Sequence, residues 1–178
     1  VQRAGRKIRE IGYAFDSDSF LAGDLTTLSD HLTESGIVEM AYQQEPESIL
    51  WPVRADGAWL GLTYNREQEV LAWHRHDTDG DVESPCVAPD PANNRDTLWL
   101  AVKRTIGGAT KRYIEYLDPD RSNVDSFVLY NGAATVTIPG LSHLEGETVD
   151  ALADGFVVRG KVVAGGQITL DTAASVVV

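Results

Sequence analysis

The run Trp-His-Arg-His at residues 73–76 is the first place where the sequence could support metal chemistry. Alternate residues of a β-strand point to the same face, so His74 and His76 could share a metal ion. A third ligand would have to come from elsewhere, for example from Asp77 or Glu83. Because zinc sites normally have three or four protein ligands, the sequence favours another interpretation. In it, the histidines are solvated or hydrogen-bonded on the strand face opposite a buried Trp73.

Residues 77–83, Asp-Thr-Asp-Gly-Asp-Val-Glu, match part of a calcium-binding loop, in which closely spaced carboxylates surround the ion. The complete loop also needs a glutamate at its twelfth position, and that spacing is missing here. A hairpin turn at Asp79-Gly80 explains the same residues more simply. We therefore interpret the segment as a turn.

Residues 155–162, Gly-Phe-Val-Val-Arg-Gly-Lys-Val, match most of a phosphate-binding loop. Val162 takes the place of the Ser or Thr that would hold magnesium. The β-branched residues around it predict a strand, whereas a phosphate-binding loop must lead into the N-terminus of a helix. We therefore assign Gly155 and Gly160 to hairpin turns.

Ser142, His143 and Glu145 are the residue types of a nucleophilic triad. Neighbours in sequence cannot easily form a nucleophile–base pair, and the chain has no nucleophile-elbow motif. Pairs of carboxylates suited to glycoside hydrolysis carry no specificity in a chain with 27 acidic residues. We therefore expect no catalytic, cofactor-binding or metal-binding residues and no cofactor.

All four tryptophans, Trp51, Trp59, Trp73 and Trp99, fall within residues 36–118. Exposed rings could form a sugar-binding platform, but tryptophan at alternating strand positions usually belongs to a core. Ile49-Leu50-Trp51 and Thr97-Leu98-Trp99 echo each other 48 residues apart, a spacing that fits one propeller blade.

The four tryptophans lie in short segments whose apolar side chains recur at every second position. This alternation is typical of half-buried strands. Turn sequences such as Asp56-Gly57 and Gly107-Gly108 separate the segments. Successive strands joined by short turns form antiparallel meanders, which pack as propeller blades, sandwiches or barrels. We expect strands at 7–15, 37–43, 48–54, 58–64, 68–76, 82–88, 97–105 and 110–117.

One helix is expected, at about 25–34. The leucines at 21, 25, 28 and 32 are spaced by four, three and four residues. Asp24 can act as the N-cap and Gly36 as the C-terminal stop. His31 would lie in this helix as a solvated or hydrogen-bonded side chain.

The polar, proline-containing segment 117–123 marks the predicted domain boundary. Residues 1–120 would form an antiparallel propeller-like β domain with the one helix, and residues 121–178 a small β domain. The expected fold class is mainly β: antiparallel meanders (partly β-propeller-like) with one short helix, plus a small C-terminal β-barrel or sandwich. The strands of the small C-terminal domain are expected at 126–130, 133–138, 147–153, 155–163, 167–170 and 174–178.

The 178 residues carry a net charge of −12 and have a pI near 4.6. Nucleic-acid binding needs a basic stripe, which is missing, and an acidic surface repels DNA phosphates. There is no membrane segment, because no apolar run approaches the length that a spanning helix needs. Cys86 stands alone and is expected to be a small apolar residue. Because the chain lacks an initiator Met, we expect it to be a piece of a longer protein.

Two stretches of the chain are distinctive. One runs from Leu-Thr-Tyr-Asn-Arg at 62–66 to Trp-His-Arg-His at 73–76, and the other is Gly-Leu-Ser-His-Leu-Glu-Gly at 140–146. With 24–32, 50–57, 113–116 and 153–155, they resemble the tail nozzle (tubular) and packaged-DNA stabilisation proteins of tailed phages and prophages. The resemblance covers roughly residues 5–175.

The resemblance implies a non-enzymatic virion structural protein, a tail nozzle or hub-like component that assembles as a ring. Its partners would be other phage tail and portal-complex proteins and, for the full-length chain, further copies of itself. DNA would be passing cargo, and the protein would reside in the virion and, during assembly, in the host cytoplasm. Two alternatives stay open. The chain could be a carbohydrate-binding or polysaccharide-degrading tail module that uses Trp59 or Trp73, or a metal-dependent protein centred on His74 and His76.

Overall fold

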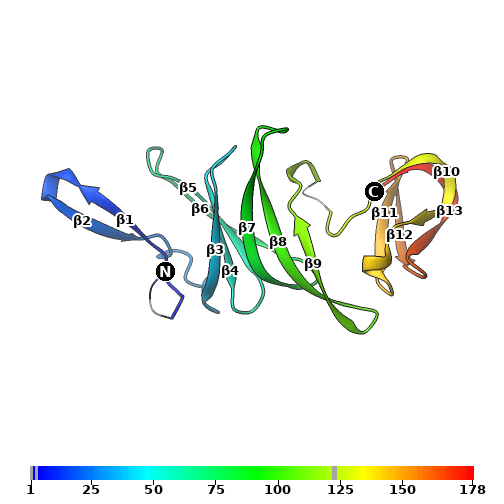
Figure 1. Cartoon of the computed structure of the whole chain (residues 1–178), viewed down its shortest axis with the longest axis horizontal. Helices are drawn as coiled ribbons and strands as arrows, with labels where there is room; N and C mark the ends of the chain where they lie inside the picture. The colour runs from blue at the N-terminus through cyan, green and yellow to red at the C-terminus, as the bar shows by residue number, and fades with distance from the viewer. Residues whose placement is uncertain (1, 3, 122–123) are drawn as a thin grey trace. The chain divides into compact units, whose positions relative to one another are not determined.

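The computed structural model describes residues 2, 4–121 and 124–178, and most of its regular structure is antiparallel strand. The predicted mainly β fold with antiparallel meanders is confirmed (Figure 1). The chain divides into two compact units. The first comprises Val1–Arg104 and Arg112–Pro119, and the second Thr105–Lys111 and Asp120–Val178. The predicted boundary segment ends with Ser122 and Asn123, which lie outside the described residues.

Three antiparallel sheets, whose strands follow chain order, lie in the described part of the first unit, except that the end of β8 and the start of β9 belong to the second unit (Figure 1). Gly57 forms the turn between the second and third strands of the four-stranded sheet with a φ of +81°, a conformation that suits glycine. The sheets are β1 (Arg9–Ala14) and β2 (Ser19–Asp24); β3 (Ile37–Gln43), β4 (Ile49–Arg54), β5 (Trp59–Asn65) and β6 (Val70–His76); and β7 (Asp81–Asp90), β8 (Arg95–Ile106) and β9 (Ala109–Tyr116).

The four-stranded and three-stranded sheets pack on each other through one buried cluster. The four-stranded sheet contributes Trp51, Val53 and Trp59. The three-stranded sheet contributes alternate residues of β8 and one residue of β7. Full burial of a large apolar side chain stabilises a fold by roughly 1.5–3 kcal/mol, so this cluster is a main source of stability for the unit. The residues from the three-stranded sheet are Val82, Leu98, Leu100 and Val102.

The opposite face of the four-stranded sheet is covered by the N-terminal segment and the loop before β3. Ile8 and Ile37 are buried there against Leu60, and Leu25 and Leu32 pack on the same cluster. This loop holds the residues for which a helix was expected.

The predicted helix at 25–34 is wrong, because the segment forms a series of turns. Its backbone bonds link residues three apart, as in Ser29 N to Thr26 O and Leu32 N to Ser29 O. Side chains compete for the backbone: the Asp24 carboxylate accepts the Thr26 amide, and the Thr33 hydroxyl donates to the Arg6 carbonyl. The leucine spacing was misleading as well, because Leu28 is 89 % exposed.

The second unit contains one four-stranded antiparallel sheet in the order β10-β13-β11-β12. The long β13 is central, and its Val177 pairs with Tyr130 of β10 and with Ala153 of β11. Breaks in register between Asn131 and Thr137 allow β10 to bend along it. The strands are β10 (Tyr130–Pro139), β11 (Thr148–Ala153), β12 (Phe156–Val162) and β13 (Gln167–Val177).

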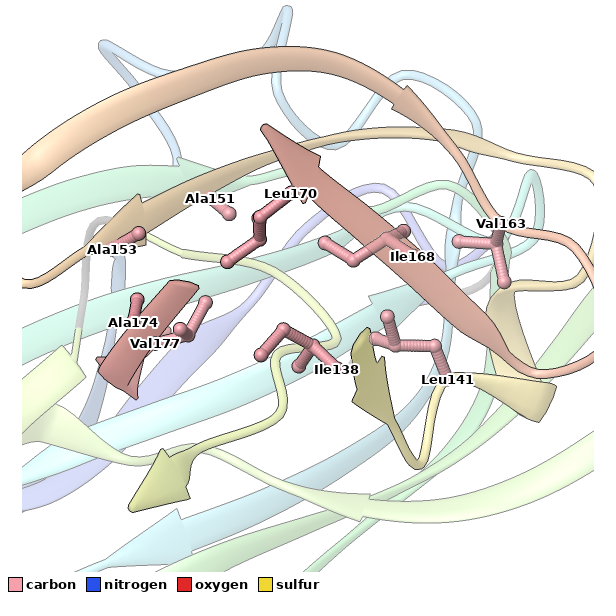
Figure 2. Packing of buried hydrophobic residues seen from close by; sticks show 9 residues of the cluster. All are labelled: Ile138, Leu141, Ala151, Ala153, Val163, Ile168, Leu170, Ala174 and Val177. Carbon is pink, nitrogen blue, oxygen red and sulfur yellow. The ribbon is translucent and has the colours of Figure 1, made fainter. Parts of the chain in front are cut away.

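Aliphatic side chains alone make up the buried cluster of this unit, and Figure 2 shows them pointing toward one another. Three predicted strands differ in extent: 126–129 is irregular, so that only Tyr130 of the strand expected at 126–130 lies in a strand, and the strands expected at 167–170 and 174–178 join into β13. The described residues also form three short 3-10 helices: η1 (Phe15–Ser17), η2 (Pro119–Arg121) and η3 (Ser142–Leu144). None of the helices in the described part of the chain has the length and apolar character needed to cross a membrane. The buried aliphatic cluster of the second unit consists of Ile138, Leu141, Ala151, Ala153, Val163, Ile168, Leu170, Ala174 and Val177.

Candidate functional site

His74 and His76 lie on the face of β6 that is turned toward the intersheet cluster. The His76 ring stacks on Trp59 at a centroid distance of 4.2 Å, and the His74 ring meets the edge of Trp51 at 5.6 Å. His74 pairs with Gly61 of β5, where a Cβ atom would come within 1.9 Å of the imidazole. Glycine at 61 therefore makes the room into which His74 packs.

The two imidazoles are hydrogen-bonded to each other, with 2.7 Å between His74 Nδ1 and His76 Nε2. One ring must donate and the other accept, so the bond requires at least one neutral imidazole. Burial, followed by the proximity of His74, lowers the pKa of His76 to about 4. Burial also lowers the pKa of His74. Burial therefore favours the uncharged form of the pair at neutral pH.

The carboxylates suggested as a third metal ligand are engaged elsewhere. Asp77 pairs with Arg75 at 3.3 Å, and Glu83 receives two bonds from the Arg112 guanidinium at 2.7 and 3.0 Å. Among residues 2, 4–121 and 124–178, no three ligating side chains come together. Trp73 points to the other face and donates its indole N–H to Leu25 O at 2.8 Å. The histidines thus lie opposite Trp73 and are hydrogen-bonded, as the favoured interpretation expected. Trp73 is only partly buried, however, and it is the histidine face that is turned toward the core tryptophans.

A cavity of about 250 Å³ opens beside His76, where the β4–β5 turn meets the start of β7. Acidic side chains line it, but Asp56 is held by Arg54 and Ser35, and Asp81 by Lys103 at 2.7 Å. The Trp59 ring is not free to stack on a sugar, because His76 covers it. The cavity is lined by Asp56, Trp59, Arg75, His76, Asp77 and Asp81, among others.

The residues of the two loop-like motifs serve the fold. Asp79 offers its carbonyl to the buried Arg104, whose guanidinium also binds Glu115 at 2.7 Å. The supposed phosphate loop is a hairpin: Gly155 turns the chain with a φ of +86°, and the following residues form β12. Gly160 lies within β12, so its assignment to a turn was wrong.

The triad-like residues are likewise separated by their bonds. The His143 Nε2 atom lies 2.8 Å from the Ser126 carbonyl. The Glu145 carboxylate accepts the amides of Gly165 and Gly166 at 2.9 and 2.7 Å, and these bonds lower its pKa. Glu145 therefore fixes the turn before β13.

Trp51 and Trp99, which end the two similar segments 49–51 and 97–99, lie in different environments. Trp51 is buried between the sheets, whereas Trp99 points outward from β8 and is 38 % exposed. Trp99 meets Tyr116 of β9 at a centroid distance of 5.3 Å. Ile114, two residues before Tyr116, shares this face and is exposed. We call Trp99, Ile114 and Tyr116 the outer aromatic face.

A second exposed apolar surface lies on the β1–β2 hairpin, which sequence reasoning did not single out. Tyr13 pairs with Phe20 across the strands, and its ring contacts both Phe20 and Phe15. Ile11 lies on the same face. The alternation of Ile11, Tyr13 and Phe15 was visible in the sequence, but β2 was hidden by the helix expected just after it. We call Ile11, Tyr13, Phe15 and Phe20 the hairpin face.

Comparison with known proteins gave no match, either to a family model or to a curated protein.

Proposed function

We propose that this chain is a non-enzymatic structural component of a tailed-phage or prophage virion, a tail nozzle or hub-like part that acts through protein–protein assembly. The observation that carries the proposal is the pair of exposed aromatic surfaces on the first unit, the hairpin face and the outer aromatic face. Exposed apolar surfaces of this kind mark sites of protein association.

Three further features support the proposal. The resemblance of residues 62–76 and 140–146 to nozzle-type proteins points to the same class. Two successive meanders pack face to face, as adjacent blades of a β-propeller and the two sheets of a β-sandwich both do. Side chains that catalysis would need are bound into the fold, including His143 and Glu145. Partners of this part would be tail and portal-complex proteins and further copies of itself, in the virion and, before that, in the host cytoplasm.

Light scattering on the full-length protein across a range of concentrations tests the proposal. We expect an oligomer of one defined size, because a ring closes at a fixed number of copies. A strict monomer at high concentration contradicts it.

One observation favours an alternative, a carbohydrate-binding tail module. Trp99 and Tyr116 present neighbouring rings to solvent, and aromatic faces of this kind can stack on sugars. A glycan array decides between the two functions: binding that is lost in Trp99→Ala but kept in Leu28→Ala, at an exposed leucine away from the rings, supports the sugar-binding module. An array without binding removes it.

A further inference from the structure

Among the residues that the structure describes, polar side chains of the β5–β6 region contact one face of the β1–β2 hairpin. The Glu10 carboxylate accepts the Tyr64 hydroxyl and lies 3.4 Å from Arg66 Nη1. A Cβ atom at Gly12 would come within 2.6 Å of the Arg66 guanidinium, so that guanidinium lies directly over the hairpin backbone. The opposite side of the hairpin is the hairpin face, and Phe15 and Phe20 on it are 88 % and 73 % exposed.

A two-stranded hairpin is at best marginally stable in water unless something packs on its apolar side. If a fully exposed aromatic side chain offers about 200 Å², the three rings of the hairpin face leave roughly 400 Å² uncovered. A stable interface buries about 800 Å² on each partner, with an aromatic centre and a polar rim. The hairpin face has the size of such a centre.

The outer aromatic face lies at the other end of the first unit. Figure 1 places the β1–β2 hairpin at one extremity and β9 at the other, with β3 to β8 between them. The two surfaces therefore cannot cover each other within one copy. Ion pairs of Lys103 with Asp81 and of Arg112 with Glu83 flank the outer aromatic face. Their charges cancel, so this face does not repel the acidic tip of the hairpin at Asp16 and Asp18.

The geometry points to a head-to-tail contact in which the hairpin face of one copy docks on the outer aromatic face of a second copy. This inference rests on the proposed assembly function and names the surfaces that carry it. Two different surfaces at opposite ends make a heterologous contact, which adds copies in one direction until the ring closes. An aromatic centre also suits a chain of net charge −12, because added salt screens repulsion between copies without weakening the contact.

Complementation between two variants tests the direction of the contact. Phe15→Ser/Phe20→Ser removes the hairpin face, and Trp99→Ser/Tyr116→Ser removes the outer aromatic face. Each variant alone is expected to be monomeric, since losing a buried ring at an interface weakens binding about 10-fold or more. Mixed, the two variants should form a dimer and stop, because each keeps one working surface. Leu28→Ser, at an exposed leucine outside both surfaces, is the control and should assemble like the wild type.

The exposed Cys86 provides a second readout, because it pairs with Trp99 across β7 and β8 and so lies on the outer aromatic face. Phe20→Cys should form disulfide-linked ladders under mild oxidation, and Phe20→Cys/Cys86→Ser should stop at dimers or monomers. Leu28→Cys is the matched control and should not form ladders.

The outcomes separate the inference from the proposed function. If the wild type forms oligomers that both surface variants retain, the head-to-tail contact is wrong while the assembly function stands. If the wild type is a monomer throughout, both fail. Wild-type thermal stability in the serine variants confirms that any loss of assembly does not come from unfolding.

Discussion

The two units are stabilised by cores of different chemistry. Between its two larger sheets the first unit buries tryptophans beside a histidine pair, and elsewhere it buries an arginine, whereas the buried cluster of the second unit is aliphatic. Polar groups in a core must be paired in a specific geometry, while aliphatic groups need only shape and volume. The first core should therefore respond to pH, whereas the second core should respond only to changes in shape and volume.

The largest effect is expected from Trp51→Ala. Removing this ring takes away the contact with Trp59 and the indole bond to Gln43 at 3.0 Å. We expect a loss of about 3–5 kcal/mol in the free energy of unfolding of the first unit. Hydrogen exchange resolved by residue measures it. Protection of β10–β13 should stay as in the wild type, and a parallel loss there would mean that the two cores unfold as one.

The matched change in the second unit is Ile168→Ala. A buried β13 side chain is shortened without touching a polar group, so the cost should be about 2–5 kcal/mol. Urea titration followed by hydrogen exchange in β10–β13 measures it. Ile168→Val should cost only about 0.5–1.5 kcal/mol, and a similar cost for both changes would argue against tight packing.

Gly61→Ala should destabilise the first unit by about 1–3 kcal/mol, because the new methyl group meets the His74 ring. His74→Ala in the same chain should recover most of that loss. A double-mutant cycle by chemical denaturation measures the coupling. Additive effects would show that the close approach of Gly61 and His74 does not limit the packing.

The histidine pair predicts a loss of stability of the first unit as the pH falls from 6.5 toward 4. The pKa of His76 is lowered from 6.5 to about 4 in the folded state. The unfolded chain therefore binds protons first, and stability that is complete above pH 6.5 falls as the pH drops toward 4. Since His76 is only partly buried, we expect a loss of about 1–2 kcal/mol. Unfolding measured from pH 7 to 4 should show this slope, and His76→Gln should flatten it.

The smallest effect is expected from Glu145→Gln in the second unit, because solvent screens the charge of this carboxylate. Its carboxylate accepts two backbone amides, which lower its pKa from 4.5. This contribution is present above that value and is lost as the pH falls through the lowered pKa. The pH profile of the second unit should therefore change only in the acid range. A change near neutrality in Glu145→Gln would contradict this assignment.

Much of the fold could be predicted from the sequence. The strands of the two larger meanders could be predicted because apolar and polar residues alternate along a half-buried strand. The helix at 25–34 was mispredicted because leucine spacing does not reveal which leucines are buried, and Leu28 is not. The strand order β10-β13-β11-β12 could not be predicted either, because pairing between strands that are distant in sequence leaves no local sequence pattern.

For the candidate site, the sequence predicted that His74 and His76 share a face but not what that face packs against. Their partners Trp51, Trp59 and Gly61 come from other strands, and only register brings them together. The outer aromatic face was missed for a similar reason. Trp51 and Trp99 follow the same dipeptide pattern, and only the three-dimensional packing distinguishes the buried ring from the exposed one.

The central place of β13 has a consequence for synthesis. The meanders of the first unit join neighbours in sequence, so they can form as each hairpin leaves the ribosome. β10 can pair only once β13 has been synthesised, and β13 is the last strand of its sheet in the sequence. Until then β10 and β11 emerge with open edges, a state in which nascent chains aggregate. A ribosome that pauses before residue 167 would hold the second unit half-made while the first is already folded.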